Sequence, residues 1–269
     1  LEIKLNEMWA VHKRCGIWRC VLLALLPILT YCSSQTTPSP NLQSNTLAAS
    51  TEPCGNSTIA GVITLKGGAP WGLIDMSSDP ACVEANRDEI NSDLGRSKHR
   101  TETVVVNDHW KLANTLIFLK SKRLDSCKIS TPTEGKPLTL QDCRFVPHVI
   151  GLQSDQALKL RNSDNTDHQF CVSPAYNPPG CIVLKPGEMN TQKKFRVAER
   201  FIQINCPQHP WEKAYLAVFS NPFFAVSDKD GRYEIKGVPP GEYTVVAWHE
   251  HYGERTSHVT IGSNQTKHV

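Results

Sequence analysis

The chain has 269 residues, with 29 Lys and Arg and 26 Asp and Glu, so its formal net charge is only +3. This length accommodates one large or two ordinary domains, and the 39% of hydrophobic residues is adequate for a packed core. The small, interspersed charge excludes nucleic acid as the main partner, because proteins that bind it concentrate Lys and Arg on one face.

Residues 1–32 are predicted to be a signal segment. Basic residues precede an apolar run from Val21 to Leu29, and small and polar residues follow it. This order is typical of a secretory signal, and the run is shorter than the roughly 20 residues that span a bilayer. We therefore expect export to the periplasm or the cell surface. The end of the segment also resembles a bacterial lipoprotein cleavage box, so a membrane tether through a lipid on Cys32 stays open beside plain secretion.

Residues 33–54 are predicted to be a flexible linker, since they are rich in Ser, Thr, Pro, Asn and Gln and can bury little surface. Beyond the linker, short runs of apolar residues are bounded by Gly, Pro, Asn and Asp, which is typical of strands. Examples are the runs 59–65, 103–106, 113–119 and 243–248. One helix is expected near residues 79–93, where Asp79 and Pro80 favour a helix start. The predicted fold class is all-β, with sandwiches as the architecture.

The most informative motif joins two predicted strands, 201–204 and 215–219. It is Cys206-Pro-Gln-His209-Pro-Trp-Glu212, which places a thiolate and an imidazole three residues apart in a short loop. Sulfur and nitrogen donors together suit a transition metal of intermediate softness, copper above all. A second imidazole, His168, ends an earlier apolar run. One Cys and two His are the equatorial ligands of a type 1 copper site, and Glu212 occupies the place where such sites usually have an axial Met.

The cysteine count agrees with a free thiol at Cys206. Seven cysteines follow Cys32, and an exported chain is expected to pair them. Seven is odd, so one thiol is left over, and setting Cys206 aside as a metal ligand leaves an even six. Pairing by proximity predicts the disulfides Cys54–Cys82, Cys127–Cys143 and Cys171–Cys181, and other connectivities stay open.

The sequence resembles two known families. Residues 228–247 form a turn, a strand, a Pro-Gly turn and a strand, and they resemble the second half of carboxypeptidase regulatory-like, transthyretin-type β-sandwiches. The runs 60–65 and 112–119 resemble the first half. The resemblance implies an outer sandwich of residues 55–123 plus 221–265, with residues 124–220 inserted as a second domain.

The inserted domain resembles the cupredoxins, and amicyanin-like members most. The resemblance rests on the strand 157–164 leading to His168, the Pro186-Gly187 turn and the Cys-x-x-His-Pro-Trp motif. It implies a Greek-key sandwich that binds one copper through His168, Cys206 and His209, with Glu212 at the axial place. The whole chain also resembles secreted bacterial proteins that combine these two domain types. A carboxylate at the axial place would favour Cu(II) and lower the reduction potential. Alternatively, Glu212 points to solvent and the site has decayed.

Two functions follow. The first is one-electron transfer, through the edge of His209, to a redox partner protein that docks on an apolar surface of Pro207, Pro210 and Trp211. The alternative is a non-redox module, in which the outer sandwich contacts carbohydrate or another surface and the insert stores copper or is degenerate. No enzyme is expected, because no Gly-x-Ser-x-Gly elbow or phosphate loop occurs.

Four further side chains carry weaker predictions. His148 is expected to be structural rather than a ligand. His249 and His251 lie two apart, so on a strand they share a face, and they form a candidate second metal pair. Met189 is expected to pack rather than to replace the axial ligand.

Overall fold

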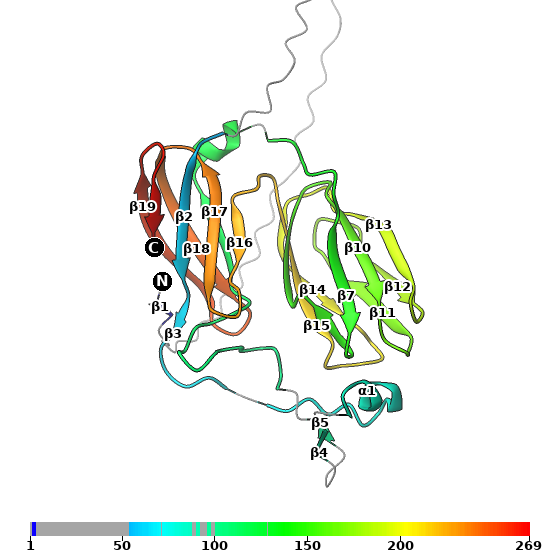
Figure 1. Ribbon diagram of the computed structural model, residues 1–269. Coiled ribbons are helices and arrows are strands. Elements are labelled where there is room, and N and C mark those ends of the chain that lie inside the picture. Colours follow the sequence, from blue (N-terminus) through cyan, green and yellow to red (C-terminus); the bar gives the residue numbers. More distant parts are fainter. Residues whose placement is uncertain are drawn as a thin grey trace, which may run out of the picture. The chain divides into compact units, whose positions relative to one another are not determined.

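A computed structural model describes residues 2–3, 54–70, 72–87, 90–91, 96–97, 100–127 and 129–269. Most of the predicted signal segment and linker lies outside these residues, as does Cys32. The structure confirms the predicted all-β class, with two sandwiches built from strands that are mostly antiparallel (Figure 1). Among the described residues, no helix has the length and apolar character needed to cross a membrane.

The outer sandwich is made of two sheets whose strands come from both ends of the described chain. One sheet has the order β16-β6-β18-β19 and the other β17-β2-β20. Their bounds are β2 Ser57–Val62, β6 Leu116–Lys120, β16 Phe224–Val226, β17 Arg232–Val238, β18 Gly241–His249, β19 Gly253–Ile261 and β20 Thr266–His268. Their facing side chains form a core that includes Ile59, Tyr233, Tyr243 and Val245.

The inner sandwich uses the strands that lie between these in sequence. Its sheets have the orders β13-β10-β7-β8 and β12-β11-β14-β15-β9. Their bounds are β7 Lys136–Gln141, β8 Arg144–Val146, β9 Val149–Gln153, β10 Ala157–Asn162, β11 His168–Val172, β12 Gly180–Leu184, β13 Met189–Lys194, β14 Glu199–Asn205 and β15 Lys213–Phe219. The alternation of buried and exposed residues in β10, as in β14, directs Leu158, Leu160, Ile202 and Ile204 into one core.

A few short elements lie outside the sandwiches. They are β1 Glu2–Ile3, β3 Thr64–Leu65, the helix α1 Pro80–Ala85, β4 Ile90–Asn91, β5 Arg96–Ser97 and the 3-10 helix η2 Lys122–Ser126. Asp79 caps α1 and Pro80 occupies its first turn, as the sequence predicts, but the helix ends at Ala85 instead of continuing to residue 93. The predicted strand 103–106 is wrong: only Val106 makes an isolated bridge, to Leu112.

The predicted disulfides are partly wrong. The structure contains Cys171–Cys181 as predicted, but it pairs Cys54 with Cys127 and Cys82 with Cys143. Proximity in sequence failed because the chain between these cysteines crosses from one sandwich to the other. Cys82 and Cys143 are both fully buried in a small cluster that also contains Ile74 and Met76. Among the cysteines that the structure describes, Cys206 alone is free, which the parity argument predicted.

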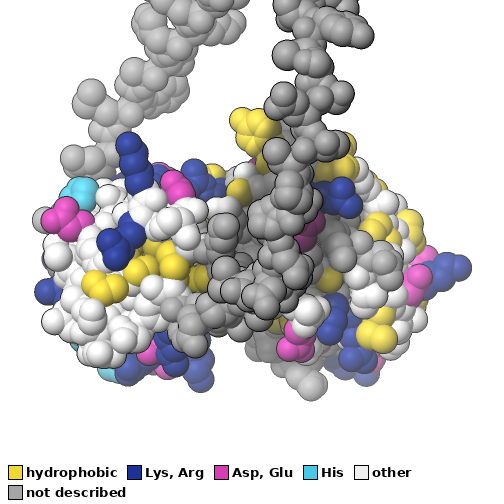
Figure 2. Space-filling model, turned by 90° about the horizontal axis from the view of Figure 1, so that it is seen from above, with side chains coloured by type: hydrophobic (Ala, Val, Ile, Leu, Met, Phe, Trp, Pro, Cys, Tyr) yellow, Lys and Arg dark blue, Asp and Glu magenta, His cyan; other side chains and the backbone are white. Residues whose placement is uncertain are grey.

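Side chains of the two sandwiches meet in a shared apolar cluster. Phe118 and Trp248 of the outer sandwich pack there with Val149 and Phe219 of the inner one. Phe118 and Phe219 lie 5.4 Å apart between ring centroids, and Phe201 of β14 stacks on Trp248 at 4.5 Å. On the face that Figure 2 shows, basic and acidic side chains are interspersed rather than gathered by sign.

His148 forms an electrostatic contact beside this cluster. It is buried between two carboxylates: its Nε2 pairs with Glu250 of the outer sandwich, and its Nδ1 lies 3.6 Å from Glu102. Burial lowers its pKa, but the two carboxylates outweigh burial and raise the pKa from 6.5 to about 9. Glu250 also faces Tyr215. The pKa of the nearby His249 is lowered to about 4 by burial and by the charges of His251 and His148, so His249 is neutral at pH 7. His148 is therefore structural.

This contact predicts a loss of stability at high pH. Because the folded-state pKa of His148 is raised, its contribution is complete below pH 6.5 and disappears as the pH rises through about 9. The shift corresponds to about 3 kcal/mol at most, at about 1.4 kcal/mol per pKa unit. Urea unfolding at pH 6 and pH 9.5 should show this drop, and His148→Gln should make the drop smaller by about this amount, while His168 and His209, whose pKa values are also raised, keep their share. An equal drop in the variant would assign it to other groups.

Candidate metal centre

The loop between β14 and β15 brings Cys206 and Glu212 to the same end of the inner sandwich. Asn205 of β14 pairs with Lys213 of β15, so the two residues that follow inward, Cys206 and Glu212, face each other across the hairpin. The Cys206 N–H donates to the Glu212 carbonyl at 3.3 Å, the His209 N–H to the Cys206 carbonyl at 3.2 Å, and the Glu212 N–H to the His209 carbonyl at 2.9 Å. These bonds fix the loop and direct His209 inward.

His168 reaches the same place from β11. This strand pairs with β14, with Cys171 opposite Asn205, so its first residues lie beside Cys206. The backbone N–H of Gln169, the next residue, donates to Cys206 Sγ at 3.3 Å. A backbone donor of this kind stabilises a thiolate, because it bonds more strongly to the charged sulfur than to the thiol.

The structure brings all four predicted side chains together. Donor atoms of His168, Cys206, His209 and Glu212 lie within 4.8 Å of one another, and all four residues are buried. His168 Nδ1 is 3.1 Å from His209 Nδ1 and 2.9 Å from Glu212 Oε1, and Cys206 Sγ is 3.6 Å from His209 Nδ1. Two nitrogens, one sulfur and a carboxylate therefore converge. Glu212 points into the cluster and not to solvent, with 1% of the residue exposed.

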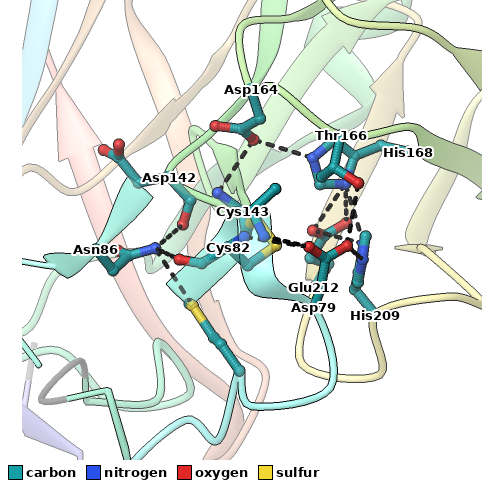
Figure 3. The surroundings of a disulfide bond; sticks show 12 residues. Asp79, Cys82, Asn86, Asp142, Cys143, Asp164, Thr166, His168, His209 and Glu212 are labelled. Carbon is teal, nitrogen blue, oxygen red and sulfur yellow. Dashed lines mark hydrogen bonds and ion pairs between the residues drawn. A yellow bond between two sulfur atoms is a disulfide. The ribbon is translucent and has the colours of Figure 1, made fainter. Parts of the chain in front are cut away.

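The outer nitrogens of both imidazoles meet carboxylates, which sequence reasoning did not find. His168 Nε2 lies 3.0 Å from Asp164 Oδ2, and His209 Nε2 lies 2.9 Å from Asp79 Oδ2 (Figure 3). An ionised carboxylate only accepts, so His209 Nε2, which hydrogen-bonds Asp79, carries hydrogen, and its Nδ1 is then left to direct a lone pair inward when the ring is neutral. The contact of His168 Nε2 with Asp164 lacks hydrogen-bond geometry and is an ion-pair contact. In the sequence, only the position of Asp164, four residues before His168, weakly indicated such a contact. Nothing indicated the contact of Asp79, because it is 130 positions from His209.

The charges around the centre favour a cation. Burial lowers the pKa of His168, but Asp164, Cys206 and Glu212 outweigh burial and raise this pKa well above 6.5. Burial also lowers the pKa of His209, but Cys206, Glu212 and Asp79 outweigh it and raise this pKa as well. Burial raises the pKa of Cys206, but both imidazoles outweigh it and lower the pKa to about 7. The acidic groups thus favour a positive charge between the two Nδ1 atoms.

Protons alone satisfy this centre poorly. Two Nδ1 atoms 3.1 Å apart can hydrogen-bond to each other only through a single proton, so two protonated rings would repel each other across this contact. Glu212 Oε1 is buried without a hydrogen bond of acceptable geometry, although both imidazoles lie within 3.1 Å of it. A single cation at the common point would satisfy the nitrogens, the sulfur and this oxygen together. The donor set therefore fits a transition metal ion that accepts thiolate, imidazole and carboxylate.

The structure buries His209, through whose edge electron transfer to a partner was predicted. The residue is 4% exposed and its outer nitrogen contacts Asp79. Pro207 and Pro210 of the same loop are exposed, and Trp211 is half-buried with its ring centroid 5.1 Å from that of His209.

The weaker candidates lie elsewhere. In the part of the chain that the structure describes, neither His249 nor His251 belongs to a group of three or more possible metal ligands. His249 is buried against Tyr252, with ring centroids 5.1 Å apart. Met189 was predicted to pack, but it is 67% exposed on β13, so this prediction is wrong. It does not reach the centre either.

A family model for the carboxypeptidase regulatory-like domain matches residues 209–269, which include β15 and the outer strands β16 to β20. The match covers less than half of the chain. It agrees with the resemblance seen at residues 228–247. A comparison with curated proteins found no significant match.

Several solved structures are similar to part of the chain. A Cu-containing nitrite reductase from Thermus scotoductus is 19% identical over 35% of this chain and 24% of its own, with a TM-score of 0.30. A reduced amicyanin mutant is 10% identical over 31% and 81%, with a TM-score of 0.28. A purple cupredoxin from Nitrosopumilus maritimus is 13% identical over 30% and 97%, with a TM-score of 0.26. With TM-scores of 0.30 or less, these partial likenesses assign no activity to the chain.

Proposed function

We propose that this chain is an exported copper-binding protein that takes up and releases one electron at a time. The observation that carries the proposal is the buried convergence of Cys206 Sγ, the Nδ1 atoms of His168 and His209, and the carboxylate of Glu212. Bound copper would supply a one-electron couple between Cu(I) and Cu(II). The chain supplies donors that both oxidation states accept, because thiolate suits the softer ion and imidazole suits either.

The surroundings of the donors support a preformed site. Each donor side chain comes from a strand end or from a loop closed by its own backbone bonds, so little rearrangement is needed when the charge of the centre changes. Burial of all four residues keeps water away from the thiolate. Glu212 is a harder donor than the usual thioether, so it would favour Cu(II) and lower the reduction potential.

A redox partner protein would meet the exposed Pro207 and Pro210 beside the site, and transient redox encounters bury little surface. Retention of copper without electron transfer is the second candidate function. One observation favours it: His209, which would carry electrons outward, is covered. In either case the outer sandwich would serve as a contact module, and the proposal assigns no catalytic group.

Export is part of the same proposal. The three disulfides among the described residues are of the kind that persists in an oxidising compartment. The predicted signal segment supplies the route, either as a secreted chain or as a lipoprotein held through Cys32.

Copper titration of the metal-free protein tests the proposal. We expect one Cu(II) per chain, with a strong thiolate-to-copper absorption band that disappears on reduction and returns on reoxidation. A band that does not return after reduction would favour the copper-retaining function. Absence of any band, with Cys206 found in a disulfide, would contradict both and leave an exported β-rich scaffold.

A further inference from the structure

The metal centre lies under a segment that the sequence places in the outer sandwich. Residues 74–86, here called the cover segment, contain α1 and pack against the end of the inner sandwich (Figure 3). The Cys82–Cys143 disulfide ties α1 to the loop between β7 and β8. Asn86 Nδ2 donates to the Asp142 carbonyl in the same loop at 3.3 Å. The cover segment is thus fixed covalently and by hydrogen bonds over the site.

The contacts at the near end of the cover segment converge on Asp79. Its Oδ1 caps α1 by accepting from the backbone N–H groups of Ala81 and Cys82 at 2.7 and 3.3 Å. Its Oδ2 lies 2.9 Å from His209 Nε2 and accepts from Thr166 Oγ1 at 3.0 Å. One carboxylate therefore joins the cover segment, the loop before His168 and the ligand His209.

Trp211, in the loop between β14 and β15, also contacts the cover segment and the loop to which it is tied. Trp211 Nε1 donates to the Cys143 carbonyl at 3.1 Å, and its ring packs on the cluster that holds the disulfide. A sulfur of Cys82 or Cys143 lies within 4.8 Å of a donor atom of Glu212, His168 or His209. The disulfide is consequently adjacent to the centre rather than a distant staple.

We propose that Asp79 is a positioning residue of the metal centre, and that the cover segment closes the outer edge of His209. This inference rests on the proposed function for its meaning in copper chemistry. Asp79 holds the ring with hydrogen on Nε2, which keeps the Nδ1 lone pair aimed at the common point. The closed edge slows exchange of the ion with solvent and prevents a partner from contacting the imidazole.

The variant Asp79→Asn separates this role from helix capping. Asn caps a helix about as well as Asp, so α1 should persist. The amide cannot reproduce a charged acceptor for His209 Nε2–H. Asp167→Asn is the matched control, because it removes the same charge one residue from His168, and Asp167 is exposed.

Two readouts test the inference. In the metal-free protein, nitrogen NMR should show a hydrogen on His209 Nε2 that exchanges slowly with solvent because Asp79 accepts from it, and Asp79→Asn should speed this exchange while Asp167→Asn should not. In the copper-loaded protein, transfer of Cu(I) to a chelator should be about 10- to 100-fold faster in Asp79→Asn, the range found when groups that orient metal ligands are removed.

The outcomes distinguish the two proposals. If the wild-type protein binds no copper, the proposed function fails, and the NMR readout still decides whether Asp79 positions His209. If copper binds but Asp79→Asn matches wild type in both readouts, the inference about Asp79 is overturned and the proposed function stands. Equal acceleration by Asp167→Asn would also overturn it, because net charge rather than contact would be the cause.

Discussion

Cys206→Ser is expected to abolish the thiolate-to-copper absorption band and to weaken Cu(II) binding by more than about 100-fold. Groups that only orient a metal ligand contribute 10- to 100-fold, and loss of the ligand itself should exceed that range. The fold should persist, since Ser differs from Cys by one atom and its hydroxyl can still accept from the Gln169 N–H that now faces Cys206 Sγ. Absorption titration and equilibrium dialysis measure the two effects.

Met189→Ser is the matched control for this variant. It also removes a sulfur, but from a side chain that is 67% exposed on β13. The control should keep the band and the affinity of the wild-type protein. A Cys206→Ser variant that retains the band would show that another sulfur binds copper, and the assignment of the centre would be wrong.

Glu212→Met is expected to raise the reduction potential and to shift the absorption spectrum. The carboxylate now lies 2.9 Å from His168 Nδ1 inside the centre, so it favours the more highly charged ion. A tenfold change in the relative affinity for two oxidation states that differ by one electron corresponds to 59 mV, and we expect a rise of at least about 60 mV. Met fits a buried site of this size because its side chain is flexible.

Glu242→Met provides the comparison for Glu212→Met. It removes a carboxylate of the same kind from an exposed position on β18 of the outer sandwich. Redox titration should find its potential unchanged. If Glu212→Met also leaves potential and colour unchanged, Glu212 is a bystander despite its burial. In the metal-free protein Glu212→Met should also lower the pKa values of His168 and His209, because Glu212 raises both pKa values.

Much of the fold and of the inner donor set could be predicted from the sequence. Strand alternation is a local property, so β10 and β14 were evident from residues such as Leu158, Leu160 and Ile202. The Cys206–Glu212 loop is also local, and its hairpin brings the ends together wherever the rest of the chain lies. His168 was placed through the family resemblance, because its contact with β14 is not local.

The surroundings of the site could not be predicted, because they depend on contacts between distant segments. Asp79 reaches His209 only after residues 74–86 cross to the inner sandwich, and the Cys82–Cys143 disulfide depends on the same crossing. Proximity pairing assigned Cys82 to Cys54 for want of that information. The burial of His209 could not be predicted for the same reason. A helix as short as α1, with six residues, carries no periodic pattern that would indicate what it covers.

X-ray absorption at the copper edge of the loaded protein tests the central claim most directly. The account predicts one sulfur neighbour at roughly 2.3 Å and two imidazole nitrogens near roughly 2.0 Å, distances typical of thiolate and imidazole bonds to a similar ion. It also predicts that the sulfur signal disappears in Cys206→Ser. A copper surrounded only by nitrogen and oxygen in the wild-type protein would contradict the proposed centre.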